Sequence, residues 1–164
     1  MVVSYNKLID ADSMFKSNKK KCIGEYAPEM NNKHKAISVY FLELEKKAIP
    51  GCIVDELMLS VLIIWYVIEK CYYKRIAIIT EEDININIKL YNSRFNTPYA
   101  IKSGASELSV FIEYEENIFK YAIFILEKYY KDIEKVPHNV LVHYLSAVKC
   151  FEDKLEYTRN REKN

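Results

Sequence analysis

The chain has 164 residues, half of them hydrophobic and 29% charged, which is enough to bury the core of one ordinary domain. Its 24 Lys and Arg residues balance 23 Asp and Glu residues, for a net charge of +1. This balance excludes a strongly basic surface and makes nucleic acid a poor default partner. The chain has only 3 Gly and 4 Pro, and tight β-turns usually consume Gly, so the composition favours long helices.

The first 33 residues mix a few apolar positions with a basic run at 16–21, followed by Gly24 and Pro28. We interpret residues 1–33 as a basic, partly ordered N-terminal arm that carries a short helix. Residues 34–158 form the predicted helical domain, and residues 159–164 form a polar tail.

The domain begins with an amphipathic segment from Lys35 that Pro50 and Gly51 end. A second predicted helix runs from Asp55 to about Tyr73. Its apolar run at 57–68 is about a dozen residues long, whereas a membrane span needs roughly 20. The sequence therefore predicts a buried central helix and no membrane span.

The segment 76–114 has two interpretations. Isoleucines alternate with polar residues at 84–90, which is typical of a half-buried strand, and 76–79 would be a neighbouring strand. However, Thr80 followed by three acidic residues is a helix start signal, and Ile84 and Tyr91 fall on one helical stripe. We favour the helix, with an α+β fold containing strands between 76 and 114 as the alternative.

Two further helices complete the prediction. Apolar residues recur at helical spacing from 108 to about 131, after a turn at 103–107, and again after Pro137 as far as 158. The sequence thus predicts an all-α protein, a single globular domain of five to six helices around a buried central helix.

The sequence shows no motif of the common nucleotide-binding or hydrolytic enzymes. His138 and His143 are five residues apart on the last helix, so they face different directions and make no joint metal or acid–base pair. His34 lies in a polar linker. We therefore expect a non-enzymatic protein with no catalytic residue, metal or cofactor.

The four cysteines are widely spaced and form no metal-binding pair. No apolar secretory signal occurs within residues 1–30. We expect free thiols and a cytoplasmic or nuclear protein.

One local pattern would suit single-stranded nucleic acid, namely the tyrosines and basic residues at 72–75. If the middle of the chain were stranded, these aromatic rings would form a stacking platform. A single-stranded nucleic-acid-binding α+β protein is accordingly an alternative function.

Between Ile37 and about Tyr144 the chain resembles the cyclin family, especially the phosphate-pathway (P/U-type) cyclins. In that family an apolar helix ends in a Tyr-Ile-Asp-Arg-like motif, and Glu69 and Lys70 end a similar segment here, Tyr-Val-Ile-Glu-Lys. Arg94 lies in a segment similar to the family's Ala-Lys-Phe, and Glu115 lies in one similar to its Leu-Glu-x-x-Phe-Leu signature.

The resemblance implies a function without an active site. Arg94 and Glu115 would face a cyclin-dependent kinase, and Glu69 and Lys70 would belong to the same partner-binding set. Binding would stabilise the kinase helix that carries the catalytic Glu of the Lys–Glu pair. We therefore expect a protein-binding module, a cyclin-like regulatory subunit of a cyclin-dependent kinase.

A second resemblance is to viral Bcl-type apoptosis regulators, which are also built around an apolar central helix and bind an amphipathic death-motif helix in a groove. The Asn-Trp-Gly-Arg-like segment of that family is absent, and Trp65 lies inside the apolar run instead. This is the other alternative function.

Overall fold

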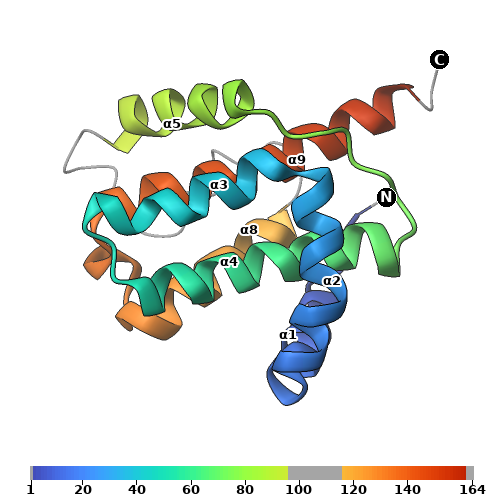
Figure 1. Ribbon diagram of the computed structural model, residues 1–164. Coiled ribbons are helices and arrows are strands. Elements are labelled where there is room, and N and C mark those ends of the chain that lie inside the picture. The colour runs from blue at the N-terminus through green and yellow to red at the C-terminus, as the bar shows by residue number, and fades with distance from the viewer. Residues whose placement is uncertain (1, 96–115, 162–164) are drawn as a thin grey trace.

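The computed structural model describes residues 2–95 and 116–161, with side chains described for 2–93 and 116–155. In these residues it contains seven α-helices and no strand, which confirms the all-α class (Figure 1). The helices, with the short 3₁₀ and π segments that extend them, are α1 (Tyr5–Ser17), α2 (Lys19–Lys33), α3 (Lys35–Leu44), η1 (Glu45–Lys47), α4 (Gly51–Tyr66), η2 (Val67–Cys71), α5 (Glu81–Phe95), α8 (Glu116–Tyr130), η4 (Ile133–Lys135) and α9 (His138–Arg161).

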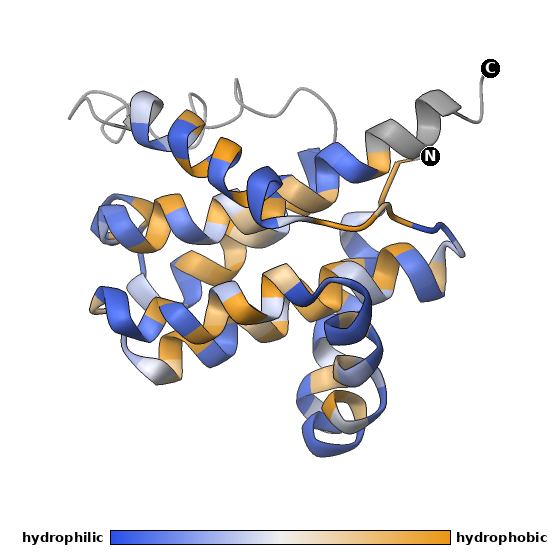
Figure 2. Cartoon of the chain, turned by 45° about the horizontal axis from the view of Figure 1, so that its top comes forward, coloured by the Kyte–Doolittle hydropathy of each residue, from blue (hydrophilic) through white to orange (hydrophobic). Residues whose placement is uncertain are grey.

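Helix α4 is the centre of the fold, as the sequence predicts. It contacts α1, α2, α3, α8 and α9, and the side chain of Trp65 is completely buried. The helix begins at Gly51, four residues before the expected start, because the carbonyl of Pro50 already accepts hydrogen bonds from Ile53 and Val54. Figure 2 shows hydrophobic residues mainly on the inward sides of the helices and hydrophilic residues on their outer turns.

The length argument against a membrane span is wrong. The helical run Gly51–Cys71 has 21 residues and is apolar and long enough to cross a membrane. However, 61% of its most apolar window is buried inside the protein. That burial is what a core helix shows, since other helices already cover the apolar surface.

The expectation of a loosely held N-terminal arm is also wrong. Residues 5–33 form two helices, and Leu8, Phe15 and Met30 are completely buried. Helix α1 contacts α4 and α8, and α2 contacts α3 and α4 (Figure 1). The lysine run misled the interpretation because it lies where α1 ends and α2 begins, on the solvent side of a helix pair whose inner side joins the core.

Residues 81–95 are helical, so the strand alternative fails there. Thr80 and Asp83 cap α5 reciprocally: the Thr80 N–H donates to Asp83 Oδ2 at 2.8 Å, and the Asp83 N–H donates to Thr80 Oγ1 at 3.3 Å. Residues 76–79 are extended but pair with no strand among the described residues. The expected turn at 103–107 and the expected strand or helix residues at 96–115 lie outside the described residues.

The last two helices agree with the sequence where they are described. Helix α8 covers the second part of the segment expected at 108–131, and α9 follows Pro137. The predicted boundary between the last helix and the polar tail is too early, because α9 continues to Arg161 rather than ending at 158. Helix α9 packs along α5, where the Asn87 amide donates to Asp153 at 3.2 Å.

Candidate partner-binding groove

Helix α3 has a buried side and an exposed apolar side. Ile37, Phe41 and Leu44 are completely buried against the core, at the i, i+4, i+7 spacing of one helical face. The opposite side exposes Val39 by 45% and Leu42 by 71%. Exposed aliphatic side chains three residues apart form an apolar strip that no described element covers.

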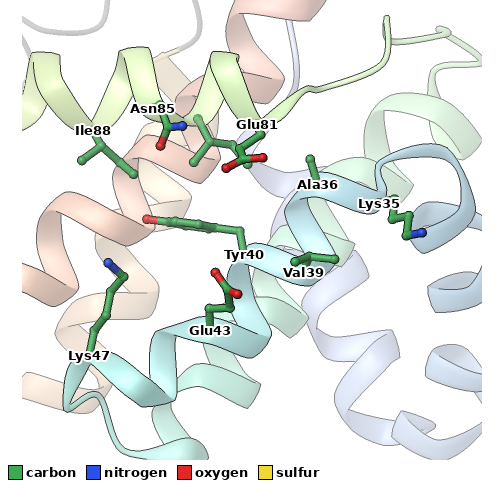
Figure 3. A pocket seen from close by; sticks show the side chains of 10 residues that line it. Lys35, Ala36, Val39, Tyr40, Glu43, Lys47, Glu81, Asn85 and Ile88 are labelled. Atoms are coloured by element: carbon green, nitrogen blue, oxygen red, sulfur yellow. The ribbon is translucent and has the colours of Figure 1, made fainter.

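Helix α5 lies beside α3 and runs in the same direction (Figures 1 and 3). Ile84, Asn87 and Tyr91 are buried, whereas Ile88 is half-buried and Ile86 is 56% exposed. The helical period therefore separates the alternating isoleucines, so that Ile84 and Ile88 face α3 and Ile86 faces solvent.

Between the two helices lies a groove with a volume of about 460 Å³. Figure 3 shows Tyr40 extending along its floor, with Ile88 at one end and Ala36 toward the other. The volume falls within the usual range of ligand pockets, and the groove is elongated along the helices. Its lining residues are Lys35, Ala36, Val39, Tyr40, Glu43, Lys47, Glu81, Ile84, Asn85 and Ile88.

The floor of the groove is uncharged at neutral pH. The Tyr40 hydroxyl forms a hydrogen bond with His143 Nδ1 of α9, and the two rings lie 5.7 Å apart. Burial raises the pKa of Tyr40. Burial, together with electrostatic repulsion from Lys47 and His138, lowers the pKa of His143 to about 4. The pair is therefore a neutral structural link between α3 and α9.

The rim of the groove carries charges with little internal compensation. No ion pair in the described part of the chain involves Lys35, Lys47 or Glu81, and Glu43 has only Lys46 at 3.9 Å. By contrast, the carboxylate of Glu56 elsewhere on the surface accepts from Lys19 at 3.0 Å and from Tyr129 at 2.7 Å. An apolar groove edged by unpaired charges is typical of a surface that binds a macromolecule.

A second, smaller cleft of about 250 Å³ lies between α2 and α4. Its walls are mostly aliphatic and include Met30 and Met58, with Lys19 and Asp55 at the edge. Lys19 is already paired with Glu56. This cleft has fewer uncompensated charges than the α3–α5 groove.

Two of the residues expected to bind a partner, Glu69 and Lys70, have partners within the chain. Glu69 is only 10% exposed; its carboxylate pairs with Lys33 and accepts a hydrogen bond from the Ile76 N–H at 3.0 Å. Lys70 pairs with Glu29 at 2.6 Å. Both residues lie in η2, where they hold the end of the central helix against α2.

The side chains of the other two expected contact residues lie outside the described residues. Arg94 belongs to the last turn of α5, and its side chain is outside the described residues; Glu115 is outside them altogether. Glu69 and Lys70, the two expected residues whose side chains are described, do not line the α3–α5 groove.

The basic aromatic segment at 72–75 does not form a stacking platform. The hydroxyl of Tyr72 accepts a hydrogen bond from the Ser4 N–H at 2.8 Å, and Lys7 lies over its ring. Of the two tyrosines, only Tyr73 is open to solvent, at 86% exposure.

His34 lies in the core and not in a polar linker, contrary to the prediction from the sequence. It links α2 to α3, it is completely buried, and its ring packs against Phe151. Its Nδ1 accepts a hydrogen bond from the Ile79 N–H at 3.3 Å. The available signal was its spacing, because Met30, His34, Ile37 and Phe41 lie on one helical stripe.

Metal-ligating and thiol side chains were the remaining candidates for a chemical site in the described residues. These residues contain no group of three or more potential metal ligands, and all four cysteines are free thiols. Burial raises the pKa of the Cys150 thiol to about 12, so this thiol is not a nucleophile at neutral pH. The α3–α5 groove is the arrangement with the most evident capacity to bind another molecule.

Comparison of the chain with protein-family models, with curated proteins and with solved structures found no significant match.

Proposed function

We propose that this protein is a non-enzymatic protein-binding module whose α3–α5 groove receives the apolar face of an amphipathic helix from a partner protein. The observation that carries the proposal is the combination of an apolar strip, an elongated groove and rim charges without ion partners on the same two helices. Amphipathic helices bind to other proteins in this helix-in-groove mode through anchors at i, i+3, i+4 and i+7.

The energetic basis is the burial of apolar side chains on both sides. Val39 and Ile88 are partly exposed in the free protein, and an anchoring Leu or Phe contributes about 1.5–3 kcal/mol when it is fully buried. The neutral floor formed by Tyr40 and His143 adds no cost of desolvating a charge. Rim charges would add mainly specificity and association rate.

The cyclin resemblance gives a first partner to test, a cyclin-dependent kinase. A kinase helix that carries a catalytic Glu is amphipathic, and holding it in place would favour the active kinase. A death-motif helix, as bound by Bcl-type proteins, is the second class to include, since its mode of binding is the same.

The test measures binding of a cyclin-dependent kinase and of death-motif peptides to wild type, Val39→Glu and Ile86→Glu. Both substitutions place a carboxylate at a partly exposed aliphatic position, but only Val39 lines the groove. The proposal is supported if either partner binds wild type, if Val39→Glu lowers the affinity at least tenfold, and if Ile86→Glu lowers it less than twofold. Equal effects of the two substitutions, or no binding of any amphipathic helix, would overturn it. If only the death-motif peptides bind, a cyclin-dependent kinase is excluded as the partner, but the groove is still supported as the binding site.

A further inference from the structure

The groove has a direction, because both of its walls run the same way. Lys35 and Glu81, the first residues of α3 and α5, lie at one end, and Lys47 and Ile88 lie toward the other (Figure 3). Each helix has partial positive charge at its N-terminus and partial negative charge at its C-terminus. The end at Glu81 thus collects two helix N-termini.

The side chains along the groove add to this polarity. Figure 3 shows the Glu81 carboxylate and the Lys47 ammonium directed toward the space between the helices, at opposite ends, whereas the Lys35 ammonium points away from α5. Neither Glu81 nor Lys47 has an ion partner among the described residues. Glu43, nearer the middle, has Lys46 at 3.9 Å.

We infer that the partner helix lies antiparallel to α3 and α5, with a basic residue in its last turn beside Glu81 and an acidic residue in its first turn beside Lys47. This inference rests on the proposed function and specifies its partner. The antiparallel direction places the negative end of the partner's dipole at the positive ends of the two walls. Parallel binding would place like ends together at both ends of the groove.

The probe is a displayed library of amphipathic helices with one apolar pattern, in which the first-turn and last-turn positions are either Glu or Lys. Clones are selected on wild type and retained only when Val39→Glu abolishes their binding. Among these clones, helices that begin with Glu and end with Lys should exceed the reverse arrangement by about fivefold, which corresponds to two modest charge contacts. Equal or reversed frequencies would overturn the inference.

A charge-swapped protein, Lys47→Glu with Glu81→Lys, controls for the intrinsic stability of such helices. Acidic first turns stabilise any isolated helix, and this bias is the same for both proteins. Because the swap makes both charge contacts unfavourable, it should lower the ratio of the two arrangements by about 25-fold relative to wild type. An unchanged ratio would show that Glu81 and Lys47 do not read the partner's charges.

The orientation is measured separately with a nitroxide at the C-terminal end of a selected helix. Signals of Ala36 and Glu81 should broaden and those of Lys47 should not. Broadening at Lys47 instead would overturn the antiparallel direction while the groove remained a binding site. If no clone depends on Val39, the proposed function itself fails.

Discussion

The most unusual side chain is that of His34, an imidazole buried completely between helices. Burial, reinforced by Lys33 and opposed by Glu69, lowers its pKa from 6.5 to about 4. Its Nδ1 accepts the Ile79 N–H, so the neutral form is the one the fold requires. Protonation would place a charge in the core and remove that acceptor.

This arrangement makes stability depend on pH in a defined window. Below pH 6.5 the unfolded chain binds a proton at His34 that the folded chain does not bind until about pH 4. The contribution of neutral His34 to the free energy of unfolding is therefore complete above pH 6.5 and is lost as the pH falls toward 4, for about 3 kcal/mol in total. His34→Asn keeps an oxygen near the position of Nδ1 but cannot titrate. Urea unfolding at pH 7 and pH 4.5 should show a smaller decrease for His34→Asn than for wild type, and parallel decreases would contradict the assignment.

The low glycine content also explains why non-glycine residues adopt the left-handed backbone conformation. Ala48, Tyr73 and Lys131 all have positive φ at the ends of helical segments, positions where glycine is usual. Lys131 has φ 65° and its N–H donates to the carbonyl of Glu127 at 2.7 Å. A chain with so few glycines accepts this conformational cost at its helix ends.

Lys131→Gly should therefore raise the free energy of unfolding by about 0.5–1 kcal/mol, since relief of the left-handed strain exceeds the added backbone entropy. Glu127→Gly, one turn earlier inside α8, should lower it by about 1 kcal/mol. Chemical denaturation measures both. The same sign for the two substitutions would mean that the left-handed residue is not strained.

Among the elements, the junction of α2 with η2 shows how neighbouring residues have different roles. Glu69 is largely buried and joins Lys33 to the extended segment after η2, whereas the pair of Lys70 with Glu29 is much more exposed. Removing a buried carboxylate leaves both of its partners unsatisfied. Removing one member of an exposed pair costs little.

Glu69→Ala should lower the free energy of unfolding by about 2–3 kcal/mol, and Lys70→Ala by about 1 kcal/mol or less. Thermal or urea unfolding of the two variants provides the comparison. If Glu69 acted only as a contact for a partner, its substitution would leave the stability of the isolated protein unchanged.

For the whole molecule, the N-terminal helices are part of the core rather than an appendage. Phe15 is completely buried and its ring contacts those of Tyr26 and Tyr66. The hydroxyl of Tyr121 in α8 donates to Asp12 of α1 at 3.0 Å, so polar contacts accompany the apolar packing. The domain therefore starts at α1 and not at residue 34.

Phe15→Ala should lower the free energy of unfolding by about 3–5 kcal/mol, the usual cost of a cavity of this size. Lys21→Ala, at an exposed position of α2, should change it by less than about 0.5 kcal/mol. A loosely held arm would give two small effects of similar size.

The helices could be predicted from the sequence where signals for a helix start or end were clear. The cap formed by Thr80 and Asp83 correctly outweighed the alternating isoleucines of α5, and Pro50 correctly separated α3 from α4. Residues 1–33 were misread because lysines at a helix junction look like a solvated segment when their neighbours in space are unknown.

The groove could not be predicted, because it depends on two helices about 40 residues apart lying side by side. Glu69 and Lys70 were placed in the partner set by sequence similarity alone. Their internal ion pairs depend on α2, which the sequence interpretation had assigned to the arm.

Hydrogen exchange on the complex with the tightest selected helix would show whether a partner helix binds between α3 and α5. Binding between α3 and α5 should slow exchange within 35–47 and 81–88 and leave it unchanged elsewhere. Protection confined to the walls of the α2–α4 cleft, at 19–30 and 55–62, would contradict binding at the α3–α5 groove.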